Sequence, residues 1–461
     1  MSEKEKIKGK IKNKNGKQEE FNNNYINEET KLLKKNISSQ NKEIVINEIC
    51  AKMLNFSDGL STFSNLAITY YLKDNLQLSP SKSALIQSIL SFPSILKPLF
   101  GFMSDVYPFF GYKRKSYILI NSILIFISWI ILFFFNPSVT LTILILLIKA
   151  ICKTFLGACS SAVLVEISKE RSKNDKKLEN FNTTIIYINI GMIISSTTRG
   201  IALEYFGIKN LFLISGLLSI LNIISGILYQ ENIIKKELNK ESNNNSIKHN
   251  FKQLYDLVKQ KQILLLLIYM LIMTITPSYY ESSFYFLTDI KGFTKIDFGN
   301  MTIILMLIFF INSIINKRFL NSFNPHKVII YTTIFAFLFS SVYNIWIYFN
   351  LKSKAILFSG ISLYIGFKAL SVKPIFNLGF LVCPNGYEGS VMGLFYSIRD
   401  LGDTLATLFG SYLAYILDIQ RKKYSTLNKM IYIINFISLL PILFINIIKD
   451  KSIVLIRENK D

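Results

Sequence analysis

The sequence predicts an all-α membrane protein with twelve transmembrane helices in two six-helix halves. Three observations carry this prediction: unbroken apolar runs, one long polar gap near the middle of the chain, and an uneven distribution of Lys and Arg. The chain has 461 residues, of which 51% are hydrophobic, yet its formal net charge is +22. A soluble chain spreads its apolar residues periodically. The bunching found here excludes a soluble enzyme, a disulfide scaffold and a nucleic-acid binder.

The apolar runs have the length that a lipid bilayer demands. Residues 117–135 and 263–273 contain no charged side chain. A bilayer core about 30 Å thick is crossed by about 20 apolar residues in a helix. We therefore expect spans at residues 54–72, 82–105, 116–135, 139–166, 181–203, 209–230, 263–290, 296–316, 327–349, 353–382, 388–418 and 428–447.

Polar segments divide the chain into domains. Residues 231–262 are polar and basic, with ESNNNS near their centre, and we interpret them as a cytoplasmic linker. This linker separates an N-terminal half (51–230) from a C-terminal half (263–447). Residues 1–50 are rich in Lys, Asn and Glu and are expected to form a disordered cytoplasmic tail, because they bury too little apolar surface to fold. Residues 448–461 are expected to form a second cytoplasmic tail.

The distribution of basic residues predicts the orientation. The two tails, the linker and the short loops on their side hold most of the 52 Lys and Arg residues. Segments enriched in this way face the cytoplasm, so both termini are expected inside. No apolar signal-peptide core follows the start. The plasma membrane is the expected location, with an organellar membrane as the alternative.

Short motifs repeat between the halves. The first span ends in Tyr70–Asp74 (YYLKD) and the seventh in Tyr285–Asp289 (YFLTD). Spans four and ten each carry two lysines, namely Lys149, Lys153, Lys368 and Lys373. These places are equivalent in a six-plus-six chain, so they favour the parallel repeat of the major facilitator type.

Ionisable residues inside the spans are the candidate functional groups, because a charge in the bilayer costs at least a few kcal/mol and usually faces a cavity. Basic residues outnumber acidic ones there, which favours an anionic solute. Arg399 and Asp403 are spaced to pair on one helix face, either as a structural or gating pair or in direct work on substrate or protons. Glu281 either lines a cavity or packs between helices. Lys97 and Lys373, near span ends, are expected to reach lipid headgroups.

The loop GFMSDVYPFFGYKRK at residues 101–115 is a candidate conformational clamp. Asp105 can accept hydrogen bonds from a helix N-terminus or an arginine, while the basic triplet holds the loop at the cytoplasmic surface. The clamp residues are Gly101, Asp105, Gly111, Lys113, Arg114 and Lys115.

Together these stretches resemble the folate–biopterin transporter family, a branch of the major facilitators. Residues 70–117 carry the family's aromatic-Leu-Lys-Asp and Lys-Pro-Leu-x-Gly-x-x-Ser-Asp patterns. Residues 276–293 resemble its seventh span, and residues 383–390 (CPNGYEGS) resemble its Cys-Pro motif. The Asn/Lys bias suggests an apicomplexan member. The resemblance implies a secondary transporter that moves folate or a pterin by alternating access, coupled to protons.

The departures from the family fall among the charges. Span four keeps only Glu166 where the family has further acidic residues, and SIRDLGD at residues 397–403 adds Arg399, Asp400 and Asp403. The alternatives are therefore another small organic solute, such as S-adenosylmethionine, or a non-transporting membrane sensor or scaffold.

The expected roles follow from chemistry, since cations suit carboxylates and aromatic rings can stack on a pteridine. The expected substrate-binding residues are Lys149, Lys153, Lys368, Arg399, Arg199, Tyr279, Tyr280, Tyr70 and Tyr71. The expected proton-coupling or gating residues are Glu166, Glu281, Asp400, Asp403 and Asp58. No enzyme motif is present, so the expected partners are a small-molecule substrate and the lipid bilayer, without cofactor, metal or nucleic acid.

Overall fold

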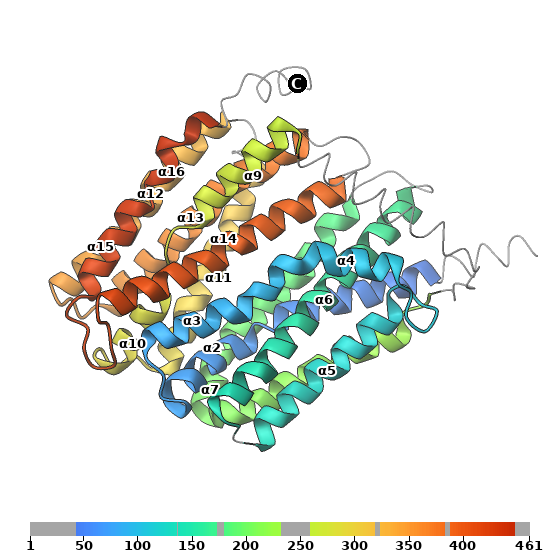
Figure 1. Ribbon diagram of the computed structural model, residues 1–461, viewed down its shortest axis with the longest axis horizontal. Coiled ribbons are helices and arrows are strands. Elements are labelled where there is room, and N and C mark those ends of the chain that lie inside the picture. The colour runs from blue at the N-terminus through green and yellow to red at the C-terminus, as the bar shows by residue number, and fades with distance from the viewer. Residues whose placement is uncertain are drawn as a thin grey trace, which may run out of the picture.

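The fold is helical, as the sequence predicts. A computed structural model describes residues 43–135, 137–172, 179–231, 259–318, 323–382 and 388–447. Among these residues the only extended pairings are two isolated bridges in loops. Figure 1 shows the N-terminal helices, blue to green, as one group and the C-terminal helices, yellow to red, as a second group beside it.

The first group opens with a helix at residues 43–60. The elements that follow are α2 (Phe63–Tyr70), η1 (Tyr71–Asn75), α3 (Pro80–Ser91), η2 (Phe92–Leu96), α4 (Lys97–Val106), α5 (Lys115–Phe134), α6 (Val139–Ser172) and α7 (Glu179–Leu228). The long α7 consists of two helical stretches joined at Gly207, whose φ of 76° is readily adopted only by glycine. The break falls between the fifth and sixth expected spans.

The second group begins at α9. Its elements are α9 (Lys261–Thr274), α10 (Tyr280–Asp289), α11 (Lys295–Arg318), α12 (Pro325–Tyr348), α13 (Lys354–Val382), α14 (Glu388–Ile416), α15 (Leu427–Ile437), α16 (Leu440–Leu443) and η4 (Ile445–Ile447). Local sequence explains where two of the helices, one in each group, begin. Ser79 and Asn324 cap α3 and α12, and each is followed by a proline at the first helical position.

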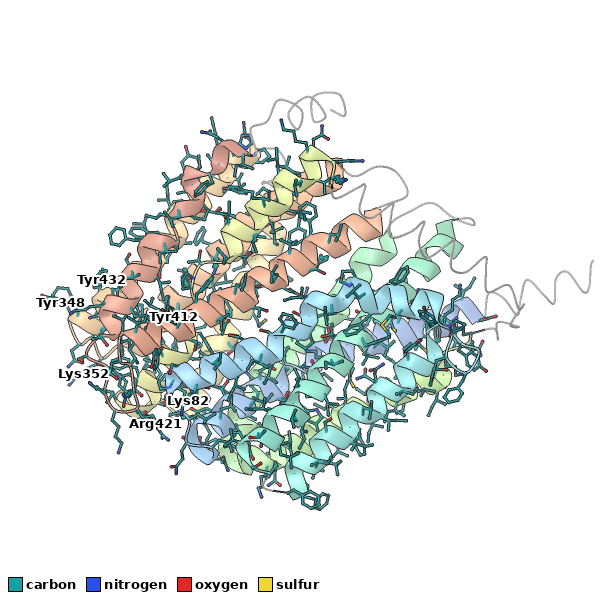
Figure 2. The ribbon with its side chains drawn as sticks, in the orientation of Figure 1. Lys82, Tyr348, Lys352, Tyr412, Arg421 and Tyr432 are labelled. Carbon is teal, nitrogen blue, oxygen red and sulfur yellow. The ribbon has the colours of Figure 1, made fainter. Side chains whose placement is uncertain are left out.

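The outer surface fits a membrane. Within the described residues, eight helices are long and apolar enough to span a bilayer, and the chain is a multi-pass membrane protein. Figure 2 places exposed Tyr348, Tyr412 and Tyr432 near Lys352 and Arg421 at one end of the bundle. Tyrosines gather in this way at the level of lipid headgroups.

The first helix begins earlier than the sequence suggested. Residues 43–50 were expected in a disordered tail, but they are helical, so the boundary at residue 50 is wrong. The apolar side of this short stretch is enough to hold it, since Cys50 is fully buried and Ile46 packs against the core. Glu48 and Lys52 pair one turn apart at 2.9 Å. Residues 1–42, 232–258 and 448–461, which include the expected tails and most of the linker, lie outside the described residues.

The two groups meet along α3 with α14 and along α7 with α11. The second contact is a crossing of glycines. A Cβ placed on Gly200 of α7 would lie 2.9 Å from the Cα of Gly299 and 2.8 Å from the carbonyl oxygen of Lys295, both on α11. The backbones can approach this closely only because neither residue carries a side chain.

We expect Gly200→Ala to lower the melting temperature of the purified protein, because the added methyl pushes α7 away from α11. Overpacking of this kind costs about 1–3 kcal/mol. Gly157→Ala is the control, since a Cβ there meets nothing within 4 Å. It should leave the melting temperature unchanged or raise it, because alanine favours a helix by roughly 0.5–1 kcal/mol over glycine. Equal shifts in the two variants would contradict the crossing.

Candidate functional site

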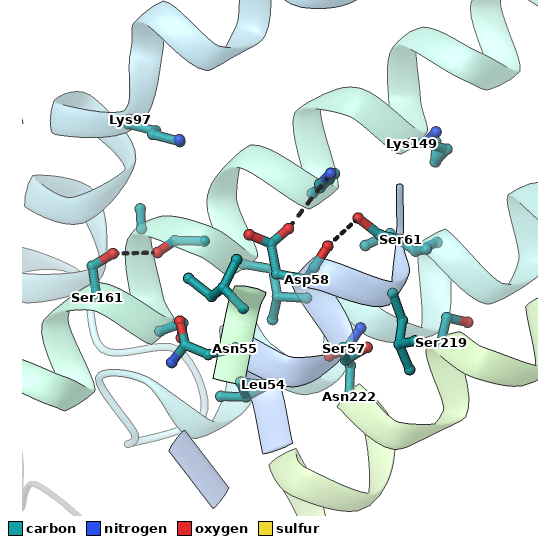
Figure 3. Close-up of a pocket in the computed structure, with 18 of the residues that line it drawn as sticks. Leu54, Asn55, Ser57, Asp58, Ser61, Lys97, Lys149, Ser161, Ser219 and Asn222 are labelled. Carbon is teal, nitrogen blue, oxygen red and sulfur yellow. Dashed lines mark hydrogen bonds and ion pairs between the residues drawn. The ribbon is translucent and has the colours of Figure 1, made fainter. Parts of the chain in front are cut away.

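Two cavities contain most of the charged residues that the sequence singled out within the expected spans. The first, here called the lysine cavity, has a volume of about 510 Å³ and is lined by Lys97, Lys149 and Lys153 together with Asp58. Its walls come from the helix at residues 43–60, α2, α4, α5, α6 and α7, with Tyr396 of α14 at one edge. Figure 3 shows Asp58 near the centre, between Lys97 and Lys149.

Positively charged side chains outnumber negatively charged ones in the lysine cavity. The Nζ of Lys153 lies 3.5 Å from Oδ1 of Asp58. The Nζ of Lys149 lies 4.5 Å from the centre of the Trp129 ring, a cation–π contact. Lys149 and Lys153 are one turn apart on α6 and line the same cavity, as their spacing predicts. With one acidic residue among its lining side chains, this cavity favours an anion.

Serines and asparagines supply the other polar groups of the lysine cavity. Ser215, Ser219 and Asn222 follow a spacing of four and three residues along α7, which places them on one face. The hydroxyls of Ser215 and Ser219 donate to backbone oxygens of their own helix, so their lone pairs stay available to a ligand. Oδ1 of Asn222 and Oγ of Ser160 are buried without a hydrogen-bond partner in the described part of the chain.

The second cavity, here called the carboxylate cavity, has a volume of about 610 Å³ and lies between helices of both groups. Three acidic residues, Glu281, Asp400 and Asp403, line it with a single arginine, Arg199. Glu281 is 6% exposed, and its Oε2 accepts a hydrogen bond of 3.3 Å from Oγ of Ser83 on α3. The cavity therefore joins the two groups through a buried carboxyl.

Two ion pairs border the carboxylate cavity. Arg399 and Asp403 pair at 3.6 Å on α14, which confirms the pairing that their spacing predicts. The Nζ of Lys97 lies 3.8 Å from Oδ2 of Asp400. Lys97 was expected to reach lipid headgroups, but it lies on a cavity wall, because Asp400 from the other group supplies a counter-ion. This pair connects the two cavities.

Arg199 bridges the groups as well. Its guanidinium donates to Oγ1 of Thr302 on α11, and its Nε is buried without a partner among the described residues. Tyr280 also lines the carboxylate cavity. Both residues were expected to bind substrate, but they line a different cavity from the lysines of α6, which line the lysine cavity.

The remaining candidates are placed elsewhere. Tyr70 and Tyr71 pack in the core against Phe284 and Phe212, at ring-centre distances of 4.9 and 5.4 Å. Tyr279 is buried against Tyr364 and hydrogen-bonds Ser340. Lys368 lies on α13 and lines neither cavity. The side chains of Glu166 and Asp105 lie outside the described residues.

The loop at residues 101–115 is held in a way that the sequence did not suggest. The carboxylate of Glu231, just after α7, accepts from the backbone N–H groups of Lys113, Arg114 and Lys115 at 2.9–3.0 Å. These N–H groups stand at the start of α5, where an acidic side chain is favoured by the helix dipole. The Arg114 guanidinium donates to Ser104. Glu231 therefore ties the loop to the end of the N-terminal group.

A buried ion pair closes one end of the bundle. The Nζ of Lys73 in η1 lies 2.8 Å from Oδ1 of Asp289 at the end of α10, and the two side chains are 7% and 9% exposed. The hydroxyl of Tyr424 donates to Oδ2 of Asp289 at 2.7 Å, and Arg421 donates to the carbonyl oxygen of Lys73 at 3.1 Å. Burial and the neighbouring Asp289 raise the pKa of Tyr424 above its ordinary value, so the hydroxyl keeps its proton. We call Lys73 and Asp289 the end pair.

Sequence reasoning missed several of these groups, although the sequence held signs of them. The end pair falls within the two repeated motifs, at the same end of equivalent spans. Asn222 and its neighbouring serines form a polar stripe on an otherwise apolar span, which indicates a cavity face. Trp129 gave no such sign, because aromatic residues are abundant throughout the chain.

The sequence profile of the BT1 family matches residues 58–461, which include the carboxylate cavity, the end pair and most residues that line the lysine cavity. The chain belongs to the BT1 family. Folate transporter 1 of Plasmodium falciparum (isolate 3D7) is 28% identical over 436 residues, which cover 93% of this chain and 85% of that protein. The folate-biopterin transporter of Synechocystis sp. (strain ATCC 27184 / PCC 6803 / Kazusa) is 27% identical and covers 86% of this chain and 82% of its own length.

Solved structures show the same fold as this BT1 protein. The nucleoside transporter NupG superposes with a TM-score of 0.67 at 13% identity, covering 88% of this chain and all of that chain. A D-xylose–proton symporter superposes with a TM-score of 0.62 at 14% identity, covering 87% of this chain and 96% of its own. The fold is that of the major facilitator transporters, as the sequence predicts. BT1 proteins are transporters and not enzymes.

We expect Asp289→Asn to lower the melting temperature strongly, because it leaves Lys73 buried beside only the more exposed Asp74. Removing one partner of a buried pair costs about 3–5 kcal/mol. The double variant Lys73→Gln/Asp289→Asn should recover part of this loss, since no buried charge is then left unpaired. Lys423→Gln, which breaks the exposed pair of Lys423 with Asp418, is the control and should cost at most about 1 kcal/mol. No recovery in the double variant would mean that the end pair is not a coupled unit.

Proposed function

We propose that this BT1-family protein moves a folate or a pterin across a membrane by alternating access. The observation that carries the proposal is the lysine cavity, a positively charged chamber inside a transporter fold. Folate carries two carboxylates, which suit its lysines. The relatives named as folate and folate-biopterin transporters align along most of the chain, which supports the same substrate class here.

The proposed topology has twelve crossings in two halves of six. In this arrangement α9 and α10 form one crossing, α15 with α16 and η4 forms another, and the two stretches of α7 form two. The N-terminal half then extends from residue 43 to 230 and the C-terminal half from 263 to 447. Both termini are proposed to face the cytoplasm, because the basic residues gather on that side.

With the proposed topology, the end pair assigns the structure to one state of the transport cycle. Lys73, Asp289 and the loop that carries Arg421 all follow odd-numbered crossings, so the proposed topology places them outside. In this topology the protein is therefore closed at its outer end. Opening it requires that a buried ion pair be separated and hydrated, and the alternating movement of the two halves would do this.

Proton coupling is the second part of the proposal. Moving a dianion into a cell costs about 2.3 kcal/mol per charge for each 100 mV of opposing potential, and protons that move with it offset that cost. Glu281 is the first candidate carrier, because it is buried between the halves with one long hydrogen bond to a neutral serine. Asp400 and Asp403 are the next candidates. Asp58 lies in the other cavity.

One observation favours a second substrate class. The carboxylate cavity carries three acidic residues and one arginine, which suits a cation. S-adenosylmethionine is cationic overall and would be bound there. The two candidates thus differ in the cavity used and in the sign of the charge that is recognised.

Labelled folate, biopterin and S-adenosylmethionine are offered to the purified protein in liposomes, with the inner and outer pH set separately. Folate and biopterin should be taken up. Lys149→Gln should lower folate uptake roughly tenfold, since a hydrogen bond to a charged group contributes about 1.5–3 kcal/mol. Lys373→Gln is the matched control on α13, outside both cavities, and should transport as the unaltered protein does. Uptake of S-adenosylmethionine alone would favour the second class, and uptake of none of the three would exclude both.

We expect Glu281→Gln to abolish the accumulation of folate that an acidic outer solution drives, while exchange of labelled for unlabelled folate at equal pH persists. The amide keeps the shape of the side chain but cannot carry a proton. Glu204→Gln, which alters an exposed partner of Lys295, should keep the response to the gradient. If gradient-driven uptake survives in Glu281→Gln, Glu281 is not the carrier.

A further inference from the structure

We propose that the lysine cavity is a two-ended recognition site, in which Lys149 binds a carboxylate of the ligand and Asp58 binds the donor edge of its heterocycle. Asp58 is thereby the residue that selects ligands with a pteridine over organic anions that lack one. This inference rests on the proposed function and assigns Asp58 a part distinct from proton coupling.

The cationic end is built around Lys149. In the described part of the chain its Nζ lies over the face of Trp129, and that ring is 4% exposed and packed on Phe212 at 5.4 Å. A π face attracts a cation but leaves its N–H groups without acceptors. An anionic oxygen placed beside Lys149 supplies those acceptors, and it also separates the like charges of Lys149 and Lys153.

The acidic end is Asp58. Its side chain is 45% exposed to the cavity, and its contact with Lys153 is 3.5 Å long. Charge-assisted N–H···O bonds are typically about 2.7–2.9 Å, so Lys153 leaves the carboxylate free to accept stronger bonds. Its neighbour Ser61 donates to the backbone oxygen of Asp58 and not to the carboxylate. Figure 3 shows the carboxylate standing in the middle of the chamber.

The walls between the two ends are already polar. Asn222 and Ser160 are each 6% exposed, and each presents a buried oxygen that lacks a partner among the described residues. Buried polar atoms usually have hydrogen-bond partners. These two side chains line the cavity from α7 and α6, so a polar ligand that fills the cavity completes their hydrogen bonds.

The ligand chemistry matches this layout. A pterin presents a ring N–H and an exocyclic amino group side by side, and a carboxylate accepts from both in parallel, as it does from a guanidinium. Folate adds glutamate carboxylates at the far end of the molecule. The cavity volume of about 510 Å³ falls within the range of about 300–1,000 Å³ found for small-molecule sites.

Three ligands separate the two ends in a binding assay on the purified full-length protein. Biopterin has the heterocycle without a carboxylate, 4-aminobenzoylglutamate has the carboxylates without the pteridine, and folate has both. The affinity of the unaltered protein, Asp58→Asn, Asp58→Glu, Lys149→Gln and Lys153→Gln is measured for each ligand. Melting temperatures without ligand show which variants are folded.

Asp58→Asn should weaken biopterin and folate roughly 10- to 100-fold and leave 4-aminobenzoylglutamate unchanged or tighter, because Lys153 loses its counter-ion. Lys149→Gln should weaken folate and 4-aminobenzoylglutamate and spare biopterin. Asp58→Glu keeps the carboxylate and should retain more biopterin binding than Asp58→Asn. Lys153→Gln should retain biopterin binding, since Asp58 remains.

Two results would overturn the assignment. Biopterin affinity within twofold of the unaltered protein in Asp58→Asn would show that the heterocycle does not contact Asp58. Equal weakening of all three ligands in Asp58→Asn would show that Asp58 acts only as the counter-ion of Lys153. If the unaltered protein binds neither folate nor biopterin, the proposed function itself fails.

Discussion

The arrangement of this protein depends on the cost of placing charge in a bilayer. A lone ionised group there is expensive, so each one needs a counter-ion or a water-filled space. Lys73 with Asp289 and Lys97 with Asp400 each join the two groups of helices. The contacts that neutralise charge are therefore also contacts that hold the groups together. A movement that separates the groups must hydrate these residues, which links conformation to the entry of water.

Lys149 is the informative exception. Lys153 pairs with Asp58 and Lys97 pairs with Asp400, whereas Lys149 lies over the face of an aromatic ring. A cation–π contact contributes about 0.5–2 kcal/mol, which is less than an ion pair must supply to offset desolvation in a buried place. Among the described residues, no carboxylate forms an ion pair with Lys149. Under the proposed function, a substrate that binds and is then released supplies this anion.

Sequence reasoning gave the helical class, the shared face of Lys149 and Lys153 and the pair of Arg399 with Asp403, because each depends on periodicity along one helix. It did not give the division of charges between cavities. Asp58 and Asp400 were grouped as acidic residues within spans, but one contacts Lys153 and the other Lys97, from distant parts of the chain. The excess of basic residues over all spans suggested one positive interior. In the part of the chain that the structure describes, the lysine cavity and the carboxylate cavity have opposite sign, and only tertiary packing sorts the residues between them.

The contact between Lys97 and Asp400 gives these two cavities a physical connection. Under the proposed function, a substrate carboxylate in the lysine cavity competes with Asp400 for Lys97, because both are anions that bind the same ammonium group. The contact between Lys97 and Asp400 is 3.8 Å long, which is longer than a strong ion-pair hydrogen bond, so a substrate carboxylate can displace Asp400 from Lys97. When Lys97 turns to the substrate, Asp400 is left in a cavity with two other acidic residues. A carboxyl group in that setting is less costly to bury when it carries a proton. In the proposed transport cycle, substrate binding on one side of Lys97 thereby favours proton binding on the other, without direct contact between substrate and proton.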